Sequence, residues 1–166
     1  MDYTTRKADD GDTAAIMRVF NYYVENSFAA YPDKHVPEAY FAAMEDSGGD
    51  YPLYVAEDNA DKVIGFGMLR RHHRASAFDR TAEIGYFILP EHIGKGLGKA
   101  LLARLKAEAL SMGIRILLAN VSSLNEKSLR FHRNNGFEEC GRFRRIGAKF
   151  GKEFDVVWMQ KFIEEK

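Results

Sequence analysis

Three alternate glycines between a strand-like and a helix-like segment constrain the fold of this 166-residue sequence more than any other feature. Thr81–Leu89 is predicted to be a strand; Gly94, Gly96 and Gly98 follow it, and Leu97–Met112 repeats apolar residues at helical spacing. Glycines let the backbone turn so that consecutive N–H groups face one way, at the helix end where the dipole favours negative charge. The segment therefore predicts a strand–turn–helix unit that holds a phosphate or pyrophosphate. A tight connection without a ligand is the alternative.

The spacing of these glycines argues against two common nucleotide-binding motifs. A P-loop needs a glycine, four residues and then Gly-Lys-Ser/Thr, but Gly98-Lys99 is followed by Ala100, which has no hydroxyl for magnesium. Ile93 also stands where the P-loop would have its first glycine. A dinucleotide-binding fold needs Gly-x-Gly-x-x-Gly in its first strand–helix unit, whereas this turn reads Gly-x-Gly-x-Gly in mid-chain.

Alternation and apolar spacing along the rest of the chain predict an α/β order with one mixed sheet. Strands are predicted at Tyr3–Arg6, Leu53–Glu57, Lys62–Arg71, Thr81–Leu89, Ile114–Ala119, Phe137–Arg145 and Phe154–Phe162. Helices are predicted around Ile16–Val24, from Pro37, at Leu97–Met112 and, capped by Asn125, at Glu126–Asn135. The central strand–helix–strand unit should be parallel and the other strand pairs antiparallel. We expect a single domain over residues 1–166, because the length suits one domain and no linker or repeat interrupts the pattern.

The composition limits the compartment and the partners. The chain carries 24 basic and 24 acidic residues, with a net charge of −9 over residues 1–61 and +9 over residues 62–166. A neutral chain is a poor candidate for nucleic-acid binding, although the basic later portion favours a small phosphorylated ligand. No apolar run approaches the ~20 residues of a membrane span. The single cysteine, Cys140, predicts no disulfide, a core position in a strand and a cytoplasmic protein. A late group of basic residues lacks interleaved RNA-binding motifs: Arg142, Arg144, Arg145, Lys149 and Lys152.

A second segment, Asn125–Phe137, combines with the glycine turn into a recognisable pattern. It begins Asn-x-x-Ser at Asn125–Ser128 and ends in Gly136-Phe137. Together the two segments resemble the GNAT N-acetyltransferase superfamily, in which the glycine turn binds the pyrophosphate of acetyl-CoA and the second segment flanks its pantetheine arm. The resemblance implies the GNAT-like acyl-CoA N-acyltransferase fold, a central mixed β-sheet flanked by helices.

Three further features make the chain similar to the phosphinothricin and methionine sulfoximine N-acetyltransferase subfamily. His132 stands where many relatives have a tyrosine. Gly147–Gly151 with Asp155-Val156 matches a late motif of the subfamily, and Asn21–Ser27 matches its first helix. The resemblance therefore covers nearly the whole chain. It implies direct acetyl transfer to the amine of a small amino-acid-like acceptor, without an acyl-enzyme, and a homodimer.

The resemblance also implies how acetyl-CoA binds. Ile93 replaces the Arg or Gln that the superfamily has before the turn, so backbone amides carry the pyrophosphate contact. A backbone N–H near Phe87 or Ile88 would stabilise the oxyanion, because this strand separates from its neighbour in the superfamily. No metal site is predicted, since His72 and His73 have no cysteine or spaced acidic partner nearby. The implied acetyl-CoA contacts are Tyr86, Phe87, Ile88, Gly94, Lys95, Gly96, Leu97, Gly98, Lys99, Asn125 and Ser128.

Two side chains are candidates for proton transfer. Glu83 shares a predicted strand face with Phe87, and the resemblance implies that it is the base, acting directly or through water. A cross-strand ion pair with Arg74 or Arg80 is the alternative. The resemblance makes His132 a second base, or the acid that protonates the leaving thiolate. A satisfied structural histidine is its alternative.

The acceptor is the least constrained part of the sequence. Arg74 is a candidate partner for an acceptor carboxylate, with a solvated loop arginine as the alternative. Phe78 stands where the subfamily tends to have a tyrosine, and Phe28 is a candidate wall of the acceptor site. A polyamine, an aminoglycoside or a protein N-terminus are alternative acceptors. A CoA-binding sensor without turnover is the alternative from another class.

Overall fold

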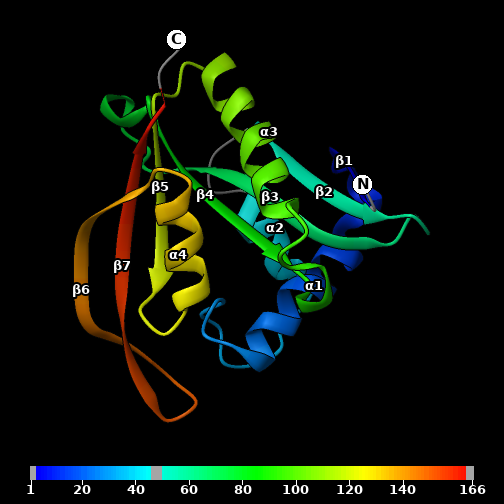
Figure 1. Ribbon diagram of the computed structural model, residues 1–166, viewed down its shortest axis with the longest axis horizontal. Helices are drawn as coiled ribbons and strands as arrows, with labels where there is room; N and C mark the ends of the chain where they lie inside the picture. Colours follow the sequence, from blue (N-terminus) through cyan, green and yellow to red (C-terminus); the bar gives the residue numbers. More distant parts are fainter. Residues whose placement is uncertain (1–2, 46–49, 164–166) are drawn as a thin grey trace.

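The computed structural model describes residues 3–45 and 50–163, whose strands form one seven-stranded mixed sheet (Figure 1). The strands are β1 Tyr3–Lys7, β2 Leu53–Asp58, β3 Val63–Arg71, β4 Thr81–Ile88, β5 Ile116–Ser122, β6 Glu138–Lys149 and β7 Lys152–Phe162. The helices are α1 Thr13–Asn26, α2 Ala39–Glu45, α3 Leu97–Ser111 and α4 Glu126–Asn134. The order across the sheet is β1-β2-β3-β4-β5-β7-β6, and β4 with β5 is the one parallel pair among the described strands. The predicted α/β class and mixed sheet are confirmed.

Helices cover both faces of the sheet and enclose two apolar cores. The first core joins α3 and α4 to the sheet, with Leu101 and Leu105 of α3 fully buried beside Leu117 of β5. The second joins α1 and α2 to the opposite face, where Ile16 of α1 packs with Phe66 of β3. Each such side chain contributes about 1.5–3 kcal/mol through burial. None of the helices in the described ranges combines the length and apolar character needed to cross a bilayer.

The carboxyl-terminal hairpin is longer than predicted. Strands β6 and β7 extend to a two-residue turn at Phe150 and Gly151, and project past the end of β5 (Figure 1). Both turn residues have positive φ angles, 52° and 72°, as a tight hairpin turn requires. The segment Gly147–Gly151 therefore lies in the end of a strand and its turn.

Cys140 corrects one prediction. It lies in β6 as expected, but it is exposed, because β6 is the edge strand and nearly all its residues face solvent. Exposed basic residues of this strand pair with acidic neighbours: Arg142 with Glu139 at 3.0 Å and Arg145 with Glu153 at 2.6 Å. The late basic residues thus do not form a single unpaired patch.

Candidate functional site

The glycine turn opens the amino terminus of α3 toward a ligand. Gly94 and Gly96 have φ angles of 84° and 85°, a left-handed conformation that side-chain-bearing residues adopt at a cost. Gly96 is the N-cap and has no side chain to cover the first amides of α3. These amides have no partner within the helix, so they and the helix dipole form an anion site. The structure thus gives the turn the geometry that its sequence predicted.

The parallel strands β4 and β5 separate beside this turn. Their pairing covers three residue pairs and ends at Glu83↔Leu118, although both strands continue (Figure 1). The N–H of Leu89 donates to β3, and antiparallel hydrogen bonds alternate along a strand. The amides of Tyr86 and Ile88 therefore point away from β3 into the gap. Ile88 was one of the two predicted oxyanion donors.

The other predicted donor, Phe87, has a different environment. Its register with Phe66 places its amide in the ladder with β3, so it does not face the gap. Its partly buried side chain packs against the core beneath α1, where it meets the Phe20 ring edge-on with centroids 5.2 Å apart. Sequence alternation could predict the face of each side chain, but not which amides remain outside the ladder.

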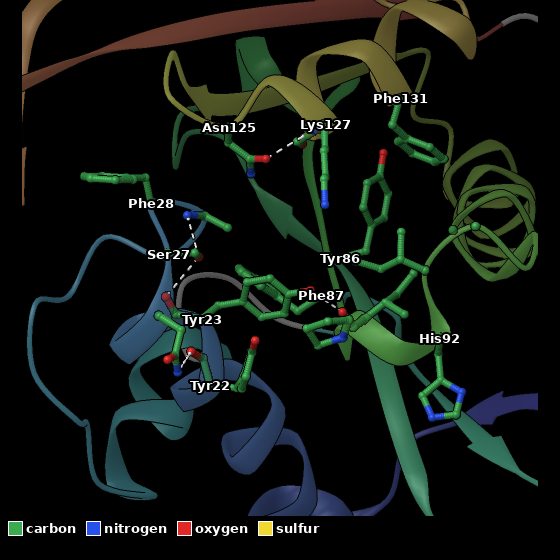
Figure 2. Close-up of a pocket in the computed structure, with 18 of the residues that line it drawn as sticks. Tyr22, Tyr23, Ser27, Phe28, Tyr86, Phe87, His92, Asn125, Lys127 and Phe131 are labelled. Atoms are coloured by element: carbon green, nitrogen blue, oxygen red, sulfur yellow. Dashed lines mark hydrogen bonds between the residues drawn. The ribbon is translucent and has the colours of Figure 1, made fainter.

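A cavity of about 760 Å³ joins the glycine turn to this gap (Figure 2). Its volume lies in the range of small-molecule sites, roughly 300–1,000 Å³. The predicted contacts that line it are Tyr86, Phe87, Ile88, Gly94, Gly96, Gly98, Lys99, Asn125 and Ser128. Lys95 and Leu97 lie outside the lining; the Leu97 side chain is 1% exposed and belongs to the core.

Further residues line the cavity that were not named individually as contacts from the sequence. Asn26, Ser27, His92, Leu124 and Lys127 line the cavity together with the predicted residues. Lys127 extends from the first turn of α4 into the enclosed space (Figure 2). With Lys99 of α3 it adds two positive side chains to a cavity that already has a helix amino terminus. The site therefore suits an elongated ligand that carries phosphate at one end.

Tyr23 of α1 reaches across to the separated strand. Its hydroxyl donates a hydrogen bond to the carbonyl oxygen of Ile88, and its ring packs against Phe87 with centroids 5.5 Å apart. Burial raises the pKa of the Tyr23 phenol to about 12, so it stays a donor. Tyr23 thus fixes a carbonyl oxygen that points away from β3, while the Leu89 N–H of the same peptide group stays bonded to β3.

Glu83 lies where the two strands begin to separate. The cross-strand ion pair given as the alternative is present, but with Arg70 in place of Arg74 or Arg80: Oε2 accepts from Arg70 at 3.2 Å. Oε1 accepts from Nδ1 of His72 at 2.9 Å. Arg70 is directly opposite Glu83 in the β3–β4 register. The Glu83 side chain is 16% exposed, so its negative charge is mostly shielded and held by two donors.

His132 is buried behind the cavity wall. It is 3% exposed and does not line the cavity, whereas Tyr86 does. Nδ1 lies 2.7 Å from the Ser128 carbonyl oxygen and therefore carries the proton, so Nε2 accepts from the Tyr86 hydroxyl at 3.0 Å. Burial lowers the pKa of His132 and raises that of Tyr86. His132 is thus a neutral ring that fixes Tyr86.

The predicted acceptor residues lie at two places. Phe28 lines the cavity. Arg74 and Phe78 are exposed in the β3–β4 connection, outside the cavity, with Phe78 contacting the His72 ring at a centroid distance of 5.9 Å. Phe78 therefore connects to Glu83 through His72.

Lys149 ties the hairpin to the loop that carries Phe28. Its Nζ donates to the carbonyl oxygens of Ser27 and Ala30, both at 2.7 Å, and it is 3% exposed. Burial lowers the pKa of this lysine. Lys149 is therefore a buried structural lysine, unlike the exposed arginines of the same late basic group.

Comparisons with known proteins point to one family. The sequence matches the Acetyltransferase (GNAT) family over residues 16–137. It is 34% identical to the L-methionine sulfoximine/L-methionine sulfone acetyltransferase of Salmonella typhimurium, over 98% of this chain and 95% of that protein.

Two solved structures share the whole fold. A GNAT superfamily phosphinothricin acetyltransferase from Sinorhizobium meliloti, in complex with acetyl-CoA, has a TM-score of 0.90 at 31% identity and covers 98% of this chain and 89% of its own. A ribosomal-protein-alanine N-acetyltransferase from Brucella melitensis has a TM-score of 0.87 at 30% identity, and the match covers 96% of this chain and 99% of that one.

Proposed function

The chain belongs to the GNAT acetyltransferase family and is an N-acetyltransferase; we propose that it transfers acetyl from acetyl-CoA directly to the amine of a small amino-acid-like acceptor. Phosphinothricin and methionine sulfoximine are the acceptor types that the relatives' names suggest. The observation that carries the proposal is the end of β4–β5 pairing at Glu83, which frees the strand amides that follow it beside a cavity that continues into an anion-binding turn. Glu83 itself lies at the last paired position, outside the residues that line the cavity.

The residues of the cavity fit acetyl-CoA. The first amides of α3, together with Lys99 and Lys127, would hold the phosphates. The amides of Tyr86 and Ile88 would meet the pantetheine arm and the thioester carbonyl, since they have no partner in the sheet ladder on that side. Donors held on a strand need no rearrangement when negative charge develops on that oxygen.

Glu83 is the carboxylate that we propose drives removal of the amine proton. Only an unprotonated amine has the lone pair needed to attack a carbonyl carbon. Arg70 fixes one carboxylate oxygen, so the charge has a defined position at the start of the gap. For the acceptor we propose contacts with Arg74, Phe78 and Phe28. His132 acts in this proposal as a positioning residue, through the hydroxyl of Tyr86.

A product assay tests the proposal. Free thiol released from acetyl-CoA is measured with methionine sulfoximine, phosphinothricin, spermidine, an aminoglycoside and an alanine-terminated peptide, and mass spectrometry identifies the product. We expect turnover with the first two and an acetylated amine. The matched control is the 2-hydroxy analogue of methionine, which has no amine and should give none. A clear preference for spermidine, the aminoglycoside or the peptide would refute the acceptor class. Tight acetyl-CoA binding with no acetylated amine would support a sensor.

The resemblance also leads us to propose a cytoplasmic homodimer. The single cysteine suits a reducing compartment. Light scattering on the eluting protein measures the mass, and a value equal to one chain would refute the dimer.

A further inference from the structure

His72 is a histidine that the family resemblance does not use. It immediately follows β3 and lies on the same face of the sheet as Arg70, two residues earlier. Nδ1 lies 2.9 Å from Oε1 of Glu83, and the His72 side chain is 28% exposed. The ring is therefore held at one nitrogen and still open to solvent or a ligand.

The position of His72 is at the beginning of the strand gap. Its ring contacts Trp158 of β7 with centroids 6.1 Å apart. Trp158 pairs with Asn120 of β5, two residues beyond Leu118, the last β5 residue that pairs with β4. His72 thus contacts Glu83 of β4 on one side and, through Trp158, the part of the sheet where β5 no longer pairs with β4 on the other.

The hydrogen bonds of His72 determine which nitrogen can act. A carboxylate accepts hydrogen bonds, so Nδ1 carries the proton toward Glu83 and Nε2 keeps a free lone pair. Within residues 3–45 and 50–163, the one hydrogen bond of the His72 ring is that of Nδ1 to Glu83. Meanwhile both oxygens of Glu83 are engaged, by His72 and by Arg70. The unoccupied base in this cluster is therefore the imidazole.

We propose that His72 receives the proton of the acceptor amine at Nε2, and that Glu83 is a positioning residue that holds the ring and stabilises its charged form. This inference rests on the proposed acetyl transfer. A carboxylate on one imidazole nitrogen and a reacting group on the other is an arrangement that recurs in acyl-transfer enzymes. The charged groups that face His72 in this cluster are Glu83 and, beyond it, Arg70.

The step balances without a further reactant. The amine nitrogen forms a bond to the acetyl carbon, one N–H proton moves to Nε2, and the carbon–sulfur bond breaks to release the thiolate. The imidazolium keeps its Nδ1–H bond to Glu83, whose negative charge offsets the new positive charge. The proton leaves to solvent through the exposed edge of the ring.

The test compares His72→Gln with His73→Gln. His73 is the matched control because it is adjacent and exposed, and bonds to the amide of Ala75 instead of a carboxylate. With methionine sulfoximine near neutral pH, we expect His72→Gln to lower kcat about 100-fold, the lower end for loss of a general base, with the KM for acetyl-CoA unchanged. We expect His73→Gln to remain within about twofold of wild type. Thermal melts confirm that both variants fold.

Two readouts separate proton transfer from a structural role. At about pH 10, where much of the free amine is already unprotonated, the deficit of His72→Gln should shrink at least tenfold. Added imidazole should restore part of the activity of His72→Ala. A deficit that is constant with pH and insensitive to imidazole would overturn the inference, as would an active His72→Gln.

A double variant tests whether the two residues act as one unit. If Glu83 acts through His72, Glu83→Gln with His72→Gln should be no slower than His72→Gln alone, because effects within a catalytic unit are not additive. Multiplicative losses would show that Glu83 acts independently and would overturn the inference. Wild-type protein that acetylates none of the amines tested would refute the proposed function, and this inference with it; wild-type activity with an unaffected His72→Gln would refute only the inference.

Discussion

Lys149→Met tests whether one buried ammonium fixes the wall of the acceptor site. Lys149 reaches from the end of β6 to the carbonyl oxygens of Ser27 and Ala30, and its Nζ lies 4.8 Å from the centroid of the Phe150 ring. Methionine has a similar length and packs well in irregular spaces, but it donates no hydrogen bond. The substitution therefore removes both hydrogen bonds from Lys149 to the loop, while the ring contacts of Phe28 with Phe150 and Phe154 remain.

The expected loss follows from these two hydrogen bonds. A hydrogen bond to a charged group contributes about 1.5–3 kcal/mol, so two contribute about 3–6 kcal/mol. Methionine does not need the desolvation that a buried ammonium requires, which offsets part of this loss. We expect the free energy of unfolding to fall by about 3 kcal/mol. A chain of this size loses about 2–4 °C of Tm for each kcal/mol, so the Tm should fall by about 6–12 °C.

Thermal unfolding followed by circular dichroism measures this change. The control is Lys152→Met, which removes an exposed lysine from the same hairpin and should shift the Tm by less than about 2 °C. Because Phe28 lies between the two anchored carbonyls, the KM for the acceptor should also rise in Lys149→Met. Equal Tm values for the two variants would refute the anchoring role, and an unchanged KM would separate the anchor from the site.

Three further substitutions test the cavity and its wall. Gly96→Val and Gly113→Val each place a branched side chain at positive φ, one at either end of α3, and should each lower the free energy of unfolding by about 1–2 kcal/mol. Calorimetric titration should show lost acetyl-CoA affinity for Gly96→Val but not for Gly113→Val, because only Gly96 lines the cavity. Equal affinities in the two variants would show that the turn is purely structural. Tyr23→Phe frees the Ile88 carbonyl and should raise the KM for acetyl-CoA about fivefold, corresponding to about 1 kcal/mol; an unchanged KM would contradict its positioning role. Because burial lowers the pKa of His132 in the folded protein, the unfolded chain takes up this proton first as the pH falls below about 6.5, so acid favours unfolding until the pH reaches the lowered pKa of the folded state. The free energy of unfolding from urea titrations should fall more steeply with acidification in wild type than in His132→Gln, by up to about 1.4 kcal/mol per pH unit; equal slopes would contradict this.

The local parts of the fold could be predicted from the sequence. The unit from β4 through the glycine turn to α3 depends on residues that are close in the chain, and so does the Asn125 cap, whose Oδ1 accepts from the Ser128 amide at 3.2 Å. Hairpin length was harder, because the turn at Phe150 and Gly151 puts a bulky residue at positive φ where the sequence suggests a loop.

Contacts between separate segments determine the features that the sequence could not predict, namely the partner of Glu83 and the burial of Lys149. Glu83 pairs with Arg70 because the β3–β4 register places them opposite each other, and that register depends on the course of residues 72–80. Lys149 is buried against the loop that contains Ser27, which lies 122 residues away in the sequence. Neither contact has a counterpart in periodicity or composition, so the sequence could name neither Arg70 as the ion-pair partner nor the buried position of Lys149.

The separation of β4 from β5 explains why one sheet can hold both halves of the proposed reaction. A strand amide that is paired in a ladder cannot bind a ligand, so the amides of Tyr86 and Ile88 are available only where pairing has stopped. The His132–Tyr86 pair lies on the α4 side of this break, and Glu83, which precedes the freed amides along the strand, shares the opposite face of β4 with Phe87. An acyl donor held along the strand amides and an amine beside Glu83 would then meet at the break without either displacing a core side chain. The loss of ladder pairing beyond Glu83 is therefore the structural condition for direct transfer.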